Sequence, residues 1–185
     1  MAKIKGSAIR GALKFVKESE GPVEIPDILE RLSPEAVPVF EQRILTADWY
    51  PYAAYAELLR TIDGHLGRGD LSLMPELGGF LAEQDVKGVL RVIATFTSVE
   101  SLVSKGGWFW SRYCDTGRSV VLEAEPGRAV MSLEDFPDVA VHHCHCITGW
   151  LGGLATKVGG SNVRSVKTRC VHRGDPRCQW EAVWS

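Results

Sequence analysis

The sequence predicts an α+β fold in a single domain, with N-terminal helices packed on an antiparallel sheet that ends in a C-terminal hairpin. Three observations predict it. Apolar residues recur at helical spacing through about residues 1–115, polar and apolar residues alternate in later segments, and the last two alternating runs flank a Gly-Asp-Pro turn. The 185 residues are 45% hydrophobic, which is enough for one sizeable core. We therefore expect residues 1–185 to form one unit, helical to about residue 115, with the sheet, a further helix and the hairpin over about residues 116–185.

The first elements are predicted to be helices. Residues 7–16 place their apolar side chains on one helical face, and Gly21-Pro22 ends this helix. A short second helix is expected over residues 26–32, before Ser33-Pro34. Asp48-Trp49-Tyr50-Pro51 is typical of the start of another helix, whose apolar stripe runs to Gly64.

The rest of the chain changes from helical to alternating spacing. Helical periods continue from residue 71 to residue 103, with expected interruptions at Gly78-Gly79 and around Lys87-Gly88. Strands are expected at residues 119–124 and 128–131, and a helix over residues 138–158. Residues 163–172 and 176–184 are predicted to form the C-terminal hairpin.

The charge balance excludes some classes of protein. There are 21 Lys and Arg against 23 Asp and Glu, giving a net charge of -2, which argues against a protein that neutralises many nucleic-acid phosphates. No apolar run reaches the roughly 18 residues that a membrane helix needs, and the N-terminus lacks a secretory apolar stretch. We expect a cytoplasmic protein whose five cysteines are mostly reduced thiols or metal ligands.

The predicted hairpin brings two cysteines together. If the hairpin is centred near Gly174, Cys170 lies opposite Cys178, Thr168 opposite Trp180, and Val166 opposite Ala182. The two thiols would then share an apolar face with Trp180 and Trp184. Core packing of two small thiols, a disulfide and part of a metal site all explain this arrangement, and a reducing compartment makes the disulfide the least favoured.

The helix before the hairpin carries further metal-ligand types in His142-His143-Cys144-His145-Cys146. Cys144 and Cys146 point about 200° apart on a helix, so only one of them can face the hairpin. His142 and Cys146 are spaced i,i+4, which also suits metal binding. Thiolates joined by an imidazole or a carboxylate would select tetrahedral zinc.

The C-terminal residues resemble a known family. His172-Arg173-Gly174-Asp175-Pro176-Arg177-Cys178-Gln179-Trp180-Glu181, preceded by Thr168-Arg169-Cys170 and the Gly149–Leu154 helix, is similar to the signature of the 4-vinyl reductase domain family. That family shares its fold with the haem nitric-oxide-binding domain and with Bet-type subunits of vesicle-tethering complexes. The whole chain also resembles an uncharacterised myxobacterial family, through residues 43–60 and 110–117.

The resemblance implies a zinc site. Aromatic-sensing domains of some bacterial transcriptional activators in the wider family hold zinc with three cysteines and a glutamate. Carried over, the cysteines are Cys144, Cys170 and Cys178, which favours Cys144 over Cys146 as the inward-facing thiol. The glutamate position is Lys167 here, and a protonated amine has no lone pair to give a metal. A fourth ligand would have to come from elsewhere, with His142, His145 and Cys146 the nearest candidates.

The resemblance also implies a hydrophobic cavity between helices and sheet that holds a small hydrophobic or aromatic molecule. The aromatic side chains suited to such a cavity could equally fill an ordinary core. The residues predicted to line it are Phe96, Trp108, Phe109, Trp110, Tyr113 and Trp150. No catalytic residue is predicted, because the chain has no nucleophile motif and Gly149-Trp150-Leu151-Gly152-Gly153 is better explained by close helix packing than by phosphate binding.

Two functions follow from these expectations. The first is a cytoplasmic sensor domain that binds a small molecule, carries structural zinc, forms a homodimer and signals to a protein partner. The second is a protein-interaction or scaffold module with the same fold and a filled pocket. A haem-based gas sensor that uses His142, His143 or His145 is a third hypothesis.

Overall fold

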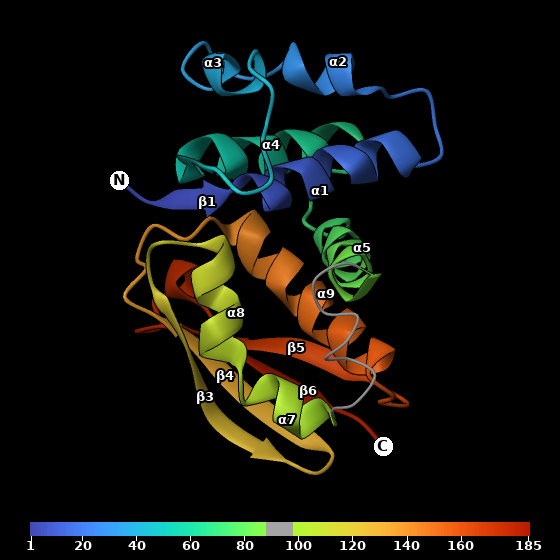
Figure 1. Cartoon of the computed structure of the whole chain (residues 1–185), viewed down its shortest axis with the longest axis vertical. Coiled ribbons are helices and arrows are strands. Elements are labelled where there is room, and N and C mark those ends of the chain that lie inside the picture. Colours follow the sequence, from blue (N-terminus) through green and yellow to red (C-terminus); the bar gives the residue numbers. More distant parts are fainter. Residues whose placement is uncertain (88–97) are drawn as a thin grey trace.

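A four-stranded antiparallel sheet forms one end of the protein, and helices are stacked away from it in layers (Figure 1). The computed structural model describes residues 1–87 and 98–185. The elements in chain order are β1 (Lys3–Lys5), α1 (Gly6–Glu18), α2 (Ile25–Leu29), α3 (Val37–Phe40), β2 (Trp49–Pro51), α4 (Tyr52–His65), α5 (Met74–Lys87), α7 (Val99–Val103), α8 (Gly106–Tyr113), β3 (Arg118–Glu125), β4 (Arg128–Glu134), α9 (Val141–Lys157), β5 (Arg164–Arg169), the 3-10 turn Val171–Arg173 and β6 (Cys178–Val183).

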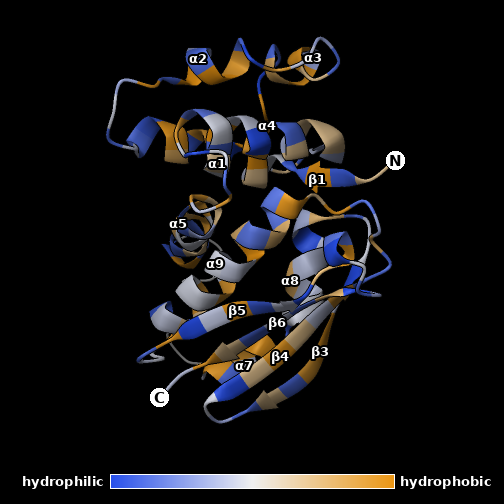
Figure 2. Ribbon diagram, turned by 180° about the vertical axis from the view of Figure 1, so that it is seen from behind, coloured by the Kyte–Doolittle hydropathy of each residue, from blue (hydrophilic) through white to orange (hydrophobic). Residues whose placement is uncertain are grey.

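The large sheet has the strand order β3-β4-β6-β5, with every neighbouring pair antiparallel. The alternation of polar and apolar residues predicted these strands. The burial of each strand distinguishes the central strands from the edge strands. Five consecutive residues of β4 are buried, whereas β5 at the edge has none. Figure 2 shows the same contrast between the largely hydrophobic β4 and the largely hydrophilic β5. The predicted α+β fold with a C-terminal hairpin is confirmed.

The register predicted for the hairpin is wrong by one residue. Lys167, and not Thr168, pairs with Trp180, and the register shifts between Lys167 and Arg169. The reason is a bulge in β5. Next to the connecting turn Arg169 pairs with Gln179, which is the register predicted about Gly174, and the extra residue between Lys167 and Arg169 shifts the pairs beyond it by one. The consequence is that Lys167 takes the place beside Trp180.

The N-terminal helices form a separate layer with its own small sheet. The segment predicted to lead into a helix also forms a strand, β2, which pairs with β1 through Ile4 and Tyr50. Helix α4 begins directly after β2, at Tyr52. Ile4 is also bridged to Cys114, the residue that follows α8. The N-terminal strand therefore ties the first helical layer to the segment that enters the large sheet.

Helices α5 and α9 pack against each other at unusually short range, and glycines make this possible. The predicted interruption at Gly78-Gly79 does not occur, because α5 runs unbroken through both residues. A side chain at Gly78 would overlap the backbone of Cys146, and one at Gly149 would overlap the backbone of Pro75. The close packing predicted for the glycines of α9 is therefore observed at Gly149.

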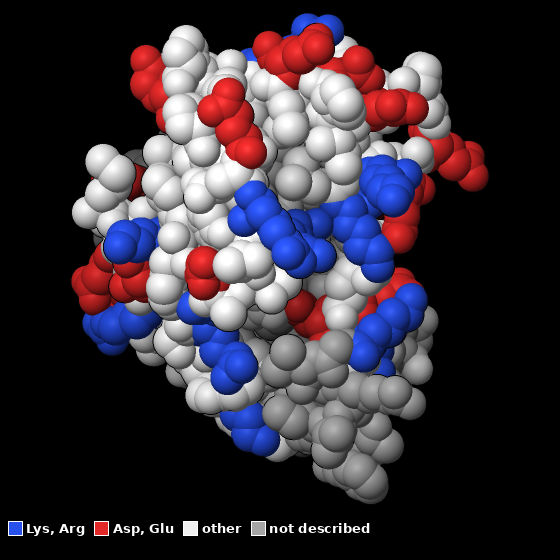
Figure 3. All heavy atoms as spheres, turned by 45° about the horizontal axis from the view of Figure 1, so that its top comes forward, with Lys and Arg blue, Asp and Glu red and all other residues white. Residues whose placement is uncertain are grey.

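The surface shows both signs of charge. On the face in Figure 3, acidic and basic side chains are interspersed, in agreement with the net charge of -2. Within residues 1–87 and 98–185, no helix combines the length and the apolar character that crossing a bilayer requires.

Candidate functional site: an apolar cavity and a neighbouring thiol cluster

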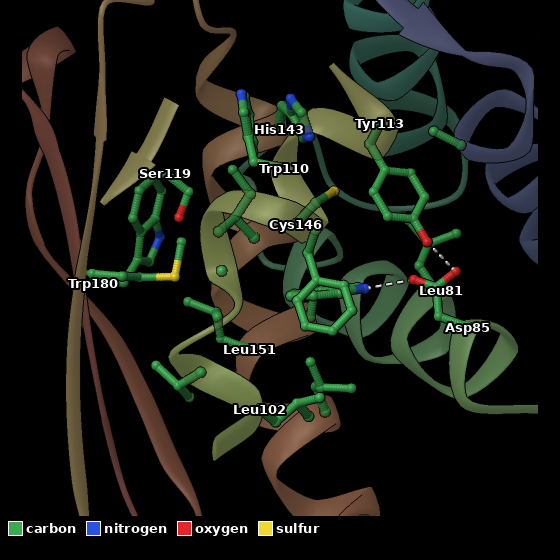
Figure 4. Close-up of a pocket in the computed structure, with 18 of the residues that line it drawn as sticks. Leu81, Asp85, Leu102, Trp110, Tyr113, Ser119, His143, Cys146, Leu151 and Trp180 are labelled. Atoms are coloured by element: carbon green, nitrogen blue, oxygen red, sulfur yellow. Dashed lines mark hydrogen bonds between the residues drawn. The ribbon is translucent and has the colours of Figure 1, made fainter. Parts of the chain in front are cut away.

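A cavity of about 140 Å³ lies between the sheet and the helices α1, α5, α7, α8 and α9. Its walls are almost entirely apolar. Met131 and Trp180, which pair across β4 and β6, form part of the sheet side, and Leu151 and Leu154 of α9 form part of the helical side. Figure 4 shows Trp180 and Ser119 on one side of this space and Tyr113 and Asp85 on the other.

The partly buried carboxylate of Asp85 forms the polar end of the cavity. The Tyr113 hydroxyl donates to Asp85 Oδ1 at 2.7 Å, and Trp150 Nε1 donates to Asp85 Oδ2 at 2.8 Å. Burial raises the pKa of Asp85, and the two hydrogen bonds act against that shift. A carboxylate offers about four acceptor positions, so Asp85 keeps acceptor capacity for a further donor.

The sheet side of the cavity contributes a second polar group. Ser119 of β3 is buried, lines the cavity, and its Oγ has no hydrogen-bond partner within residues 1–87 and 98–185. A buried hydroxyl without a partner costs about 1–3 kcal/mol. Asp85 and Ser119 are therefore polar groups on two sides of a mostly apolar space.

His143 lines the same cavity and is held in an aromatic environment. Its Nδ1 lies 3.0 Å from the Tyr52 hydroxyl, its ring stacks on Trp110, and Tyr55 meets it edge-on. Burial lowers the pKa of His143 to about 4, so the imidazole is neutral at neutral pH. The ring is a rigid, uncharged part of the wall.

Four of the predicted aromatic residues line the cavity: Phe109, Trp110, Tyr113 and Trp150. Trp108 departs from the predicted set. It is 43% exposed and packs under Arg112, because α8 turns residues 109, 110 and 113 toward the core and residue 108 away from it. Phe96 lies outside the described residues.

On the same face of the sheet as the cavity, the buried thiols of α9 and the hairpin lie close together. Cys144 Sγ is 3.6 Å from Cys178 Sγ, and Trp180 Nε1 donates to the Cys144 carbonyl oxygen at 3.1 Å. Trp180 thus contacts both the cavity and the segment of α9 that carries Cys144. Cys146 points the other way, with its Sγ 3.7 Å from Met74 Sδ on α5.

Lys167 is the one basic side chain that donates to this cluster in the described part of the chain. Its Nζ donates to Cys170 Sγ at 2.8 Å, and its positive charge also acts to lower the pKa of Cys144 and of Cys178. The hydrogen bond from Cys144, together with the positive charge of Lys167, lowers the pKa of Cys178 to about 5. The same thiol pair raises the pKa of Cys144.

The three candidates for a fourth metal ligand lie in different environments. His142 Nε2 lies 3.6 Å from the buried Asp63 of α4, and Cys146 faces α5. Burial, and next the positive charge of Lys167, lower the pKa of His145. In the part of the chain that the structure describes, no three His, Cys, Asp or Glu side chains are arranged to hold a metal ion. Zinc on Cys144, Cys170 and Cys178 stays a prediction.

Sequence reasoning missed Asp85, Ser119 and the central place of Lys167. Asp85 is one of many acidic residues on helices, and Ser119 begins an ordinary alternating strand. Neither has a local signal. The contact of Lys167 with the thiols could have been found only with the correct hairpin register.

Comparisons with known proteins agree on the fold. No protein-family model matches the chain, and comparison with curated proteins finds no match. Among solved structures, an H-NOX protein variant from S. oneidensis in the Fe(II) state has a TM-score of 0.76 at 15% identity, covering 98% of this chain and 96% of that one. Unliganded Fe(II) H-NOX protein from K. algicida has a TM-score of 0.73 at 14% identity, with 98% and 97% covered.

The phenol-responsive sensory domain of the transcription activator PoxR, solved with phenol, is similar over 89% of this chain and 92% of that chain, with a TM-score of 0.55 and 15% identity. The chain therefore has an H-NOX-like α+β fold. The fold shared by the family that the C-terminal residues resemble is thus observed, whereas no finding supports the 4-vinyl reductase or myxobacterial families themselves.

Proposed function

We propose that this protein is a sensor domain whose cavity binds a small aromatic molecule of about one ring that carries a polar group. The observation that carries the proposal is the apolar cavity of about 140 Å³ with Asp85 and Ser119 on its opposite sides. An apolar protein cavity of about 150 Å³ is known to bind benzene. A ring of this size would displace little or no ordered water, because the walls offer few polar partners.

The polar groups define how such a ligand would be oriented. Its ring would lie among Phe109, Trp110 and Leu151, and a hydroxyl or amino group would donate to the remaining acceptor positions of Asp85. A substituent at the other end would meet the Ser119 hydroxyl. The similarity of the fold to a phenol-responsive sensory domain supports this class of ligand.

The fold also brings haem into consideration, because the H-NOX neighbours contain Fe(II). The described residues do not fit it. A porphyrin joins four pyrrole rings, whereas the cavity is matched to a single ring. His143 is the histidine that lines the cavity, and its ring is clamped between Trp110 and Tyr55 with Nδ1 on the Tyr52 hydroxyl. No haem chemistry is therefore assigned to this cavity.

The output of the sensor is proposed to pass to a separate signalling protein in the cytoplasm, with the domain acting as a homodimer. Ligand binding would order the side chains that join α5, α8 and α9 around the cavity. A scaffold module with a filled pocket is the alternative, and the cavity volume argues against it.

Thermal unfolding with added phenol, benzylamine and cyclohexane tests the proposal. Ligands that bind only the folded state raise the melting temperature in proportion to the logarithm of their concentration. We expect phenol or benzylamine to raise it, and cyclohexane to do so less. Ala129→Leu, which fills the cavity from β4, should abolish the effect, whereas Thr156→Leu on the exposed face of α9 should retain it. Equal shifts in both variants, or none in the native chain, would contradict the proposal.

A further inference from the structure

The surroundings of Lys167 are unusual for a lysine on an edge strand. Its side chain is partly buried, and its Nζ lies over the Trp180 ring at 5.6 Å from the centroid and 2.8 Å from Cys170 Sγ. A lysine on such a strand normally extends its ammonium into water. Here the charge is directed inward, toward three thiols from three different segments.

The ammonium group has one direct thiol partner and acts on two more. A lysine ammonium has N–H donors and no lone pair. It donates to Cys170 Sγ, at the end of β5, at 2.8 Å. The sulfurs of Cys144 on α9 and Cys178 on β6 lie 3.6 Å apart, and the positive charge of Lys167 acts on both thiols. The ammonium is therefore the cation beside all three thiols.

We propose that the Lys167 ammonium takes the place of a metal ion beside Cys144, Cys170 and Cys178. The cluster then holds α9 against the hairpin without a bound metal. The positive charge is provided by the chain itself. It offsets negative charge on the sulfurs, and the face of Trp180 adds a cation–π contact within the range where such contacts are favourable.

The surroundings of the cluster are consistent with this role. Asp175 Oδ2 accepts a hydrogen bond from the Cys170 backbone N–H at 2.7 Å, which fixes the end of β5 and leaves that carboxylate engaged with the backbone. Cys144 and Cys178 are held by the contact between their sulfurs at 3.6 Å. The ammonium therefore meets a preformed set of acceptors.

The proposal and the zinc prediction exclude each other, because a protonated lysine repels a dication and offers it no ligand. Replacing the Lys167 ammonium by a carboxylate should therefore allow zinc to bind. Lys167→Glu would remove the ammonium and place a fourth zinc ligand beside three thiols, which is a complete tetrahedral set. Lys167→Met would remove the charge while keeping a chain that packs on Trp180.

Native mass spectrometry of the full chain, produced with zinc in the medium, provides the test. We expect the native chain and Lys167→Met to carry no zinc, and Lys167→Glu to carry one zinc per chain. The zinc should be lost again in Lys167→Glu/Cys170→Ser. Arg164→Glu, with the same change of charge at an exposed position of β5, should carry none.

Thermal unfolding gives a second readout that does not depend on whether Lys167→Glu folds. Lys167→Met should melt at a lower temperature than the native chain, and EDTA should leave the native melting temperature unchanged. Stoichiometric zinc in the native chain, folded Lys167→Glu without zinc, or Lys167→Met melting at the native temperature would each overturn the proposal.

Discussion

The contact between α5 and α9 leads to the sharpest stability prediction. Gly78 and Gly79 are neighbours in the same helix, so the intrinsic effect of Gly→Ala is the same at both, a gain of about 1 kcal/mol in helix propensity. Their surroundings differ. A Cβ at Gly78 would overlap the Cys146 carbonyl group and the Trp150 backbone nitrogen, whereas a Cβ at Gly79 would lie 3.9 Å from the Gly149 carbonyl oxygen, an ordinary contact.

The difference between the two substitutions follows from these contacts. The overlap at Gly78 involves backbone atoms of a buried helix, which cannot rotate away as a side chain can. Overpacking of this kind costs about 1–3 kcal/mol and sometimes more. After the gain in propensity is subtracted, Gly78→Ala should be destabilising by up to about 2 kcal/mol, and Gly79→Ala should be neutral or stabilising by up to about 1 kcal/mol.

Urea unfolding followed by far-UV circular dichroism measures both values. For a chain of this size, 1 kcal/mol corresponds to about 2–4 °C in melting temperature, so thermal scans should separate the variants by several degrees. Because α5 and α9 also line the cavity, Gly78→Ala should weaken the melting shift caused by phenol as well. Equal stability of the two variants would refute the reasoning that a close backbone approach requires glycine at residue 78.

Three further predictions concern buried polar groups. Burial raises the pKa of Asp85, so the folded state binds the carboxyl proton more tightly than the unfolded state does. The free energy of unfolding should therefore fall as pH rises from about 4 through the folded pKa. Asp85→Asn should remove that part of the pH dependence measured by urea unfolding. The pKa of His143 falls to about 4, so stability should decrease by about 3 kcal/mol as pH falls from about 6.5 to 4, and His143→Phe should flatten this slope. Trp180→Phe removes the N–H that donates to Cys144 and Thr148, and should lower the unfolding free energy by about 2 kcal/mol; no loss in chemical denaturation would show that these bonds contribute nothing.

The local spacing of residues was sufficient to predict most elements. Alternation along residues 119–124 and 128–131 and helical spacing along residues 138–158 correspond to β3, β4 and α9, because these patterns reflect which side of an element faces the core. The pattern failed where pairing partners decide the conformation. Residues 49–51 have no strong strand signal and become β2 only because β1 lies beside them.

Composition and local pattern by themselves determined the fold class and the C-terminal hairpin, because these depend on hydrophobic periodicity along the chain. The tertiary structure alone decided that Asp85 and Ser119 face one cavity, that Trp108 faces outward, and that the Lys167 ammonium donates to the buried Cys170 thiol. The position of Lys167 depends on the bulge between Lys167 and Arg169, which shifts the register of β5 and which the local sequence pattern did not predict. A register is set by pairing energies between distant strands and by turn geometry, and a shift of one residue reverses the face of the sheet to which each side chain points.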